Sequence, residues 1–224
     1  FVDSNILHYA RSEHQWHRYS IDSVYPDSGR YFFGDLDPVK WLAFGGYHSV
    51  TLRPWRQTGN HILVLAQRPH GWNMQGANQS TWLDSVIQDI QKYTDRPIRI
   101  RMHPGDKHRH QQIQQLMHRW GSAIEISRAE NIRGDLKHCW SAVGYNSTPT
   151  AVSAIEGIPV YVQDPDRSWA KDVCYTDLSQ IELPPCPDRA CWITKIANIH
   201  WSNEEVQKGR LWSAIKRSIF SVPV

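Results

Sequence analysis

Between residues 60 and 163 the sequence alternates short runs of strand-forming residues with stretches in which apolar residues recur at helical spacing. The predicted strands cover residues 61–66, 97–102, 123–126, 141–145 and 158–162. The predicted helices cover 80–93, 113–120, 131–139 and 146–155, with Ser80 as the N-cap of the first and Gly121 and Gly157 ending the second and the last. Alternation of this kind forms a parallel sheet with helices on both faces. We therefore predict an α/β fold.

The rest of the chain lacks this regular alternation. Residues 1–57 are rich in Tyr, Trp, Asp and Arg, and we expect them to form a small N-terminal lobe or cap, a possible acceptor side. We expect residues 58–165 to form a Rossmann-like domain around the parallel sheet. Residues 166–224 are expected to form a loop rich in Pro and Cys, then C-terminal helices that pack back on the core. Within them, Ser202-Asn203-Glu204-Glu205 is a favourable helix start.

Composition limits the class of protein only weakly. The formal net charge is +3 and the pI is about 8.7, which permits a polyanionic partner without requiring one. The 12 His and 11 Trp residues are unusual for a chain of 224, and so many Trp residues suggest exposed rings that bind sugars or stack on bases. The sequence has no run of 18 apolar residues, so we expect no membrane span.

The N-terminal residues and the cysteines bear on the compartment. Phe1-Val2-Asp3-Ser4-Asn5 has neither a basic region nor a long apolar region, so we expect no signal peptide there. We interpret the four cysteines as reduced thiols, because the C-x4-C spacing of Cys186 and Cys191 is poor for zinc. Both points favour a cytoplasmic protein.

Three polar clusters follow predicted strands. Gln67 and Arg68 come after the first strand, Arg101 and His103 lie at the end of the second, and Asn146-Ser147-Thr148 follows the fourth. In parallel sheets ligands bind outside the carboxyl ends of the strands, so we expect these clusters to converge on one edge.

The cluster at Asn146-Ser147-Thr148 is predicted to begin a helix, where free N–H groups and hydroxyl side chains bind anions. Pro149 fits the first turn of such a helix. Ser147 or Asn146 could instead be a plain N-cap. Pro104 favours an extended backbone at His103, whose ring could donate to a phosphate.

Metal binding is not expected. His103, His108 and His110 form an H-x4-H-x-H pattern, but no carboxylate or Cys completes a usual ligand set. We interpret these residues as part of a solvated, basic helix start, and we predict neither a metal nor another cofactor.

The order of these motifs resembles the donor-binding half of GT-B glycosyltransferases. Gln-Arg with Gly-Trp, then Arg-x-His-Pro, then Asn-Ser-Thr with Gly-Ile-Pro-Val is most similar to capsule-type Kdo transferases, sialyltransferase-like enzymes and bacteriophage glycosyltransferase-like proteins. The resemblance covers about residues 60–165. It implies a nucleotide-sugar donor as substrate, with its phosphate against His103 and the Asn146-Ser147-Thr148 turn, and Gln67, Arg68 and Arg101 also in contact with the donor.

The resemblance has one clear departure. Family members often carry a Glu five residues before the motif glycine, where it holds the ribose hydroxyls. Here Val152 stands at that position relative to Gly157, and Glu156 is displaced by more than a helical turn. The resemblance therefore supplies no carboxylate for the ribose.

Transfer also requires a base for the acceptor hydroxyl. In the family it usually comes from the N-terminal side, where we favour Asp22, in the strand-like alternation of residues 19–24, and then Asp3. With no Asp-x-Asp motif at a strand end, we expect N–H dipoles and cations, His103 among them, to stabilise the leaving phosphate without a metal.

The acceptor is open between two kinds of molecule. A hydroxymethylated pyrimidine in phage DNA, modified in the bacterial host cytoplasm, would use aromatic and cationic contacts such as Trp72, Arg53 and Arg56. A cell-surface saccharide, built from a Kdo-like or sialic-acid-like donor, is the alternative. A non-catalytic module that binds nucleotides or nucleic acid is the third reading.

Overall fold

The computed structural model describes residues 1–10, 15–69 and 72–220, and it contains two compact units. The sheet unit runs from Arg53 to Pro187, and the terminal unit joins Phe1–Leu52 to Asp188–Val224. This division differs from the expected one. The helices after residue 188 belong with the N-terminal segment, because a strand near the C-terminus pairs with an N-terminal strand.

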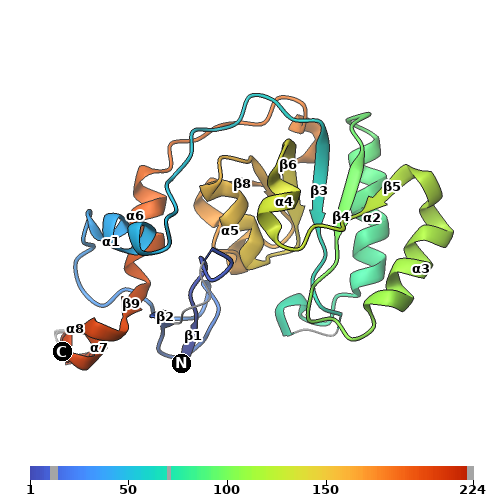
Figure 1. Ribbon diagram of the computed structural model, residues 1–224. Coiled ribbons are helices and arrows are strands. Elements are labelled where there is room, and N and C mark those ends of the chain that lie inside the picture. The colour runs from blue at the N-terminus through green and yellow to red at the C-terminus, as the bar shows by residue number, and fades with distance from the viewer. Residues whose placement is uncertain (11–14, 70–71, 221–224) are drawn as a thin grey trace. The chain divides into compact units, whose positions relative to one another are not determined.

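The sheet unit contains six strands, all parallel, in the spatial order β5-β4-β3-β6-β7-β8 (Figure 1). Their bounds are β3 His61–Leu65, β4 Ile98–Arg101, β5 Ile124–Ile126, β6 Cys139–Gly144, β7 Val160–Val162 and β8 Cys174–Tyr175. The predicted α/β fold with a parallel sheet is confirmed, and all five predicted strands are present. Counted from β3, the order is 3-2-1-4-5-6, which is consistent with a Rossmann-like fold and reverses between β3 and β6.

Helices alternate with these strands. Their bounds are η1 Trp72–Met74, α2 Gln79–Gln91, α3 Arg109–Trp120, η2 Gly121–Ala123, α4 Ile132–Leu136, α5 Thr148–Ile155, η3 Pro165–Arg167, η4 Lys171–Val173 and η5 Leu178–Gln180. The N-cap of α2 is Asn78, whose side chain accepts from Thr81 N, and not Ser80 as predicted. Gly121 and Gly157 end their helices as predicted, both with positive φ.

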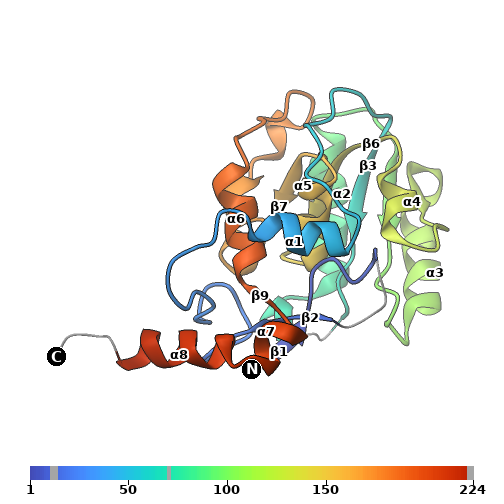
Figure 2. The same ribbon diagram turned by 60° about the vertical axis from the view of Figure 1, so that its left-hand side comes forward.

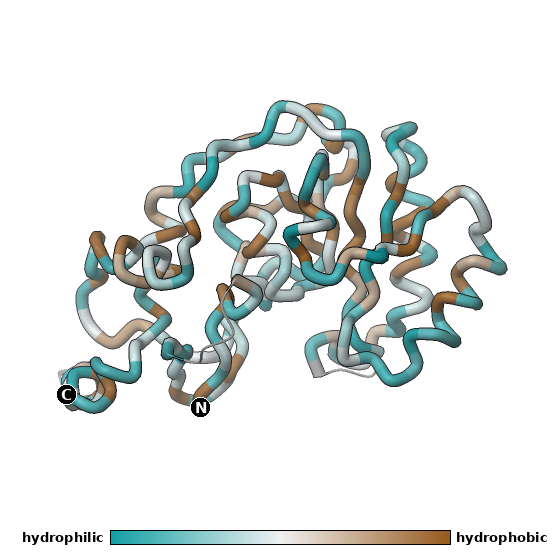
Figure 3. The backbone as a smooth tube through the Cα atoms, viewed as in Figure 1, coloured by the Kyte–Doolittle hydropathy of each residue, from teal (hydrophilic) through white to brown (hydrophobic). Residues whose placement is uncertain are grey.

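The main core lies on one face of the sheet. Alternate residues point to the same face of a strand, so Ile98 and Ile100 of β4 are buried there while Arg99 and Arg101 lie on the other face. Helices α2 and α3 cover the core face, with Leu83 and Leu116 among the residues packed into it. Figure 3 shows the hydrophobic colour along β3, which is buried on both faces as expected for a central strand.

The terminal unit is built on a three-stranded antiparallel sheet in the order β1-β2-β9. Its elements are β1 Val2–Ser4, β2 Trp16–Tyr19, α1 Lys40–Tyr47, α6 Ala190–Asn198, β9 His200–Ser202, α7 Asn203–Gln207 and α8 Arg210–Phe220 (Figure 2). Ser202 and Glu205 form a capping box at the start of α7, which confirms the predicted helix start. The strand-like reading of residues 19–24 is wrong, because β2 ends at Tyr19 and Asp22 adopts a positive φ of 74°.

Two further predictions can be compared with the described residues. None of their helices combines the length and the hydrophobicity that crossing a bilayer requires. All four cysteines are free thiols, as predicted from the sequence.

Candidate functional site

The predicted clusters after β3, β4 and β6 lie at one edge of the sheet, which we call the carboxyl edge. The three strands are neighbours and run parallel, with β3 between the other two. Neighbouring strands are about 4.8 Å apart, so the ends of β4 and β6 are separated by roughly 10 Å. His103 lies two residues after the end of β4 and Ser147 three residues after the end of β6, so both belong to loops of this edge.

Asn146 ties the loops of this edge together. Gln67 Nε2 donates to Asn146 Oδ1 over 2.7 Å, directly across the point where the strand order reverses. Asn146 Nδ2 in turn donates to Asn73 O at 2.8 Å and to Asp164 Oδ2 at 2.9 Å. Since Asn146 is buried and uses both ends of its amide, we interpret it as a positioning residue.

Other polar atoms of this edge have no partner among the described residues. Gln67 is 4% exposed, yet its Oε1 accepts no hydrogen bond there, and neither does the buried Ser147 Oγ form one. An unpaired buried polar atom costs about 1–3 kcal/mol, and most such atoms in folded proteins are paired. These two atoms can therefore receive hydrogen bonds from a ligand or from water.

Ser147 also begins α5. It occupies the N-cap position with an extended backbone, but its side chain makes no cap hydrogen bond. Thr148 is the first residue of the helix and Pro149 lies in the first turn, as predicted. The first N–H groups of a helix have no partner within it, so this end of α5 has the properties of an anion site. Ser147 is thus the N-cap residue of α5, as the alternative interpretation had it, but its hydroxyl does not cap the helix.

His103 presents one ring nitrogen to this edge. Its Nδ1 accepts from Gly105 N at 3.0 Å, so the neutral ring carries its proton on Nε2, which has no partner among the described residues. Burial and then the charge of Arg68 lower the pKa of His103, with an opposing effect from Asp106. The ring is therefore a neutral donor near pH 7.

Arg68 lies beside this histidine. A methyl group added at Gly105 would collide with Arg68 Nη2 and would also crowd the ring of His103. The lack of a side chain at Gly105 thus lets the guanidinium approach the imidazole. Together they place a cation and a neutral donor after two neighbouring strands.

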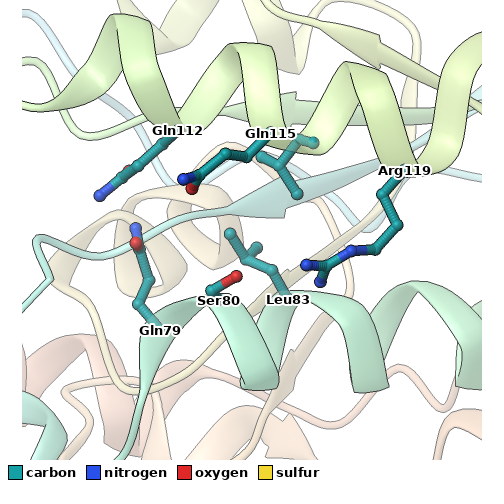
Figure 4. Close-up of a pocket in the computed structure, with 7 residues that line it drawn as sticks. Gln79, Ser80, Leu83, Gln112, Gln115 and Arg119 are labelled. Atoms are coloured by element: carbon teal, nitrogen blue, oxygen red, sulfur yellow. The ribbon is translucent and has the colours of Figure 1, made fainter.

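Gln79 holds the backbone of the loop that follows β3. Its Nε2 donates to the carbonyl of Gln67, and its side chain lines a small pocket between α2 and α3 (Figure 4). In Figure 4, Gln79 from α2 and Gln112 from α3 point toward each other across this pocket. We interpret this contact as structural, because it fixes the backbone of Gln67.

Arg101 is engaged within the protein. Its Nη1 pairs with Asp135 Oδ2 at 2.5 Å and donates to Ala129 O at 3.0 Å. Asp135 is buried and also accepts from Ser127 Oγ at 2.6 Å. The structure thus gives Arg101 a role in holding α4 against the sheet, in contrast to the predicted role in donor binding.

The predicted acceptor contacts are not brought together with this cluster. Arg56 Nη1 donates to the carbonyl of Cys139, at the start of β6, over 3.2 Å. Arg53 pairs through Nε with Glu156, after the end of α5, at 3.0 Å. Both arginines therefore lie at the opposite, amino edge of the sheet. Trp72 begins η1, but its side chain lies outside the described part of the structure.

The two predicted bases belong to the terminal unit. Asp3 lies in β1 and pairs with the buried guanidinium of Arg18 at 2.5 Å. Asp22 pairs with Arg30 at 2.7 Å, and both of these side chains are more than half exposed. Asp3 thus neutralises a buried charge, whereas an exposed pair such as that of Asp22 contributes little to stability.

Sequence reasoning missed two carboxylates at the carboxyl edge. Asp164 comes just after β7 and accepts from Asn146. Asp106 precedes α3, is 8% exposed, and has one oxygen without a partner among the described residues. The strand-end rule could have found Asp164, since it follows the predicted strand 158–162 by only two positions.

No group of three His, Cys, Asp or Glu side chains within the described ranges is placed to hold a metal ion. The pattern of His103, His108 and His110 therefore does not assemble into such a group. No protein-family model matches the sequence, and no curated protein matches it either.

Proposed function

We propose that this protein is a GT-B-like glycosyltransferase that moves a sugar from a nucleotide-sugar donor to a hydroxyl acceptor. The observation that carries the proposal is that Gln67 Oε1 and Ser147 Oγ are buried without a partner among the described residues. Both belong to the loops joined by the Gln67–Asn146 hydrogen bond, where the strand order reverses. Ligands of parallel α/β sheets bind at such points.

In this proposal the donor diphosphate lies against the carboxyl edge. His103 donates from Nε2, Arg68 supplies a positive charge, and the N-terminus of α5 offers its N–H groups. These groups favour the negative charge that develops on the leaving phosphate as the glycosidic bond breaks.

Asp164 supplies the carboxylate that is absent at Val152. Its Oδ2 is fixed by Asn146, which holds the side chain beside the same loops. A carboxylate accepts hydrogen bonds and repels phosphate, so we assign Asp164 to hydroxyls of the ribose or of the sugar.

For the acceptor we retain a hydroxymethylated pyrimidine of DNA, with Asp22 as the base ahead of Asp3. The Asp22–Arg30 pair is exposed and costs little to separate, whereas Asp3 is needed by Arg18. Both carboxylates are engaged in ion pairs, and a paired carboxylate is a poor base. This favours a second candidate, a module that binds nucleotides without catalysis.

The test is mass spectrometry of hydroxymethylated DNA and of glycan acceptors after incubation with a panel of nucleotide-sugars. We expect the added mass of one sugar on DNA and release of the nucleotide. The His103→Ala variant should lose this activity, whereas His118→Ala, an exposed residue of α3, should keep it. Transfer of sugar to a glycan but not to DNA would show that a saccharide is the acceptor. Nucleotide binding without any product would support the non-catalytic module.

A further inference from the structure

Helix α8 has two apolar faces, of which only one is covered. Leu211 and Ala214 are buried against Phe33 and neighbouring residues of the terminal unit. Trp212, Ile219 and Phe220 remain 60%, 40% and 79% exposed. At helical spacing Trp212 and Ile219 lie on one stripe, with Phe220 beside it. The helix therefore presents a second apolar surface to its surroundings.

This surface is surrounded by positive charge. Residues 206–224 contain Lys208, Arg210, Lys216 and Arg217 and no carboxylate. Lys208 pairs with Glu204 of α7, but no ion pair holds Arg210, Lys216 or Arg217 among the described residues. The Lys216 ammonium lies 5.3 Å from the centre of the Trp212 ring, so cation and aromatic ring share one side of the helix.

We propose that α8 docks on the surface of a bilayer that contains anionic phospholipids. Trp212, Ile219 and Phe220 would enter the boundary between headgroups and acyl chains, and the cations would bind lipid phosphates. Short helices with aromatic and aliphatic residues on one side and Lys and Arg beside them bind membranes in this way. Ile219 has no ring to stack on a nucleic-acid base, so the surface fits lipid better than DNA.

The same unit carries most of the other exposed apolar side chains. Nine of the twelve large hydrophobic residues that are exposed in the described ranges belong to it: Phe1, Val2, Phe32, Leu36, Val39, Leu42, Trp212, Ile219 and Phe220. Among these, the ones on α8 are combined with unpaired cations. We therefore place the contact on α8.

The experiment is co-sedimentation of the full chain with vesicles. We expect binding to vesicles of phosphatidylcholine mixed with phosphatidylglycerol and little binding to phosphatidylcholine alone, with a decrease as salt is raised. The double variant Lys216→Glu, Arg217→Glu should reduce partitioning more than tenfold, since each lost cation costs roughly fivefold. Trp212→Ser with Phe220→Ser should reduce it on the anionic vesicles as well.

Matched controls lie in the sheet unit. Leu183 is 86% exposed, and Lys137 is an exposed cation, so Leu183→Ser and Lys137→Glu should leave partitioning unchanged. All variants change exposed residues, and circular dichroism would verify that they remain folded. Equal binding to neutral and anionic vesicles, or no loss in the α8 variants, would overturn the proposal.

Two other outcomes would replace the lipid surface with another partner. Loss of DNA binding in the α8 variants, measured by gel shift without any vesicle binding, would assign the surface to nucleic acid. A dimer that dissociates on Trp212→Ser would assign it to a second copy of the chain. Vesicle binding by α8 does not depend on sugar transfer, so either proposal can fail while the other holds.

Discussion

The two edges of the parallel sheet each carry a histidine. The two histidines differ in whether a ring nitrogen is left without a hydrogen-bond partner among the described residues. His61 begins β3 at the amino edge, is 2% exposed, and contacts Asn60 Oδ1 at 2.9 Å and Asp135 O at 3.0 Å. His103 follows β4 at the carboxyl edge and uses only Nδ1 within the described structure. Burial lowers the pKa of both rings, aided by Arg99 for His61 and by Arg68 for His103.

The arginines show the same contrast. At the amino edge Arg56 and Arg53 are bonded to carbonyl groups and to Glu156. At the carboxyl edge Arg68 lies beside His103, and the preceding residue, Gln67, has an Oε1 atom without a partner among the described residues. The comparison teaches that Arg53, Arg56 and His61 hold the fold together at the amino edge. At the carboxyl edge Arg101 does the same, whereas His103 keeps a ring nitrogen without a partner among the described residues.

The largest expected effect is on the proposed transfer reaction. His103→Ala should lower turnover about 100- to 1,000-fold, because it removes a donor to the leaving phosphate. Its unfolding midpoint should fall only slightly, since the ring makes one hydrogen bond in the described structure, from Gly105 N to Nδ1, and Nε2 makes none. Nucleotide release and thermal unfolding measure the two quantities. His61→Ala should give the reverse pattern, and equal loss of stability in both variants would remove the contrast.

A pair of arginine variants sharpens the comparison next. Arg68→Ala should weaken nucleotide-sugar binding by about 1.5–3 kcal/mol, the usual contribution of a hydrogen bond to a charged group. Arg56→Ala should leave binding unchanged and lower the free energy of unfolding by about 1–3 kcal/mol, because carbonyls of Leu136 and Cys139 lose their donor. Calorimetric titration and denaturant unfolding measure the two effects. If Arg56→Ala weakened binding as much as Arg68→Ala, the amino edge would also belong to the site.

The pH dependence of binding distinguishes the two histidines. The pKa of free His103 is lowered, so the ring is neutral at pH 7, and a bound phosphate favours its protonated form. Binding therefore increases the protonated fraction of the ring, at the expense of the hydrogen bond from Gly105 N to Nδ1. Affinity should rise as pH falls from 8 toward the lowered pKa, by less than tenfold per pH unit. The slope should disappear in His103→Gln and persist in His61→Gln. A slope unchanged by His103→Gln would assign the proton to another group.

The smallest expected effect concerns Ser147. Ser147→Ala removes a buried hydroxyl that has no partner among the described residues, so stability should not fall. Binding of the nucleotide-sugar should weaken by about 0.5–1.5 kcal/mol, the net value of one hydrogen bond. Ser153→Ala is the matched control in α5, because Ser153 Oγ already donates to Pro149 O at 2.9 Å. Loss of stability in Ser147→Ala without a change in binding would return Ser147 to a structural role.

Much of the sheet could be predicted because its signals are local. Runs such as the one at β3 and helical spacing such as that of α2 identify elements without knowledge of their neighbours. The small strand β8 escaped notice, since two residues carry no periodicity. Asp22 was predicted to lie in a strand, but its backbone bends there with a positive φ, and the alternation of its neighbours was too short to be specific.

The candidate site was predicted only in part. The strand-end rule identifies which residues reach the carboxyl edge, and it applies to Gln67, His103 and Ser147. It does not say which of these side chains form hydrogen bonds or ion pairs within the protein itself. Arg101 ends β4, yet its guanidinium is taken by Asp135, a residue 34 positions later in the chain. Such a pairing depends on how α4 packs, and no local pattern encodes it.

The sequence by itself determined the α/β alternation, the parallel direction of the strands and the polar character of their ends. These follow from hydrophobic period and chain direction, which act within one element or between neighbours. Only the tertiary structure decided that Asn146 joins three loops, that Asp164 lies at the same edge, and that Arg53 and Arg56 lie at the other. Hydrogen bonds of this kind form between segments far apart in the chain, so they are fixed when the sheet assembles.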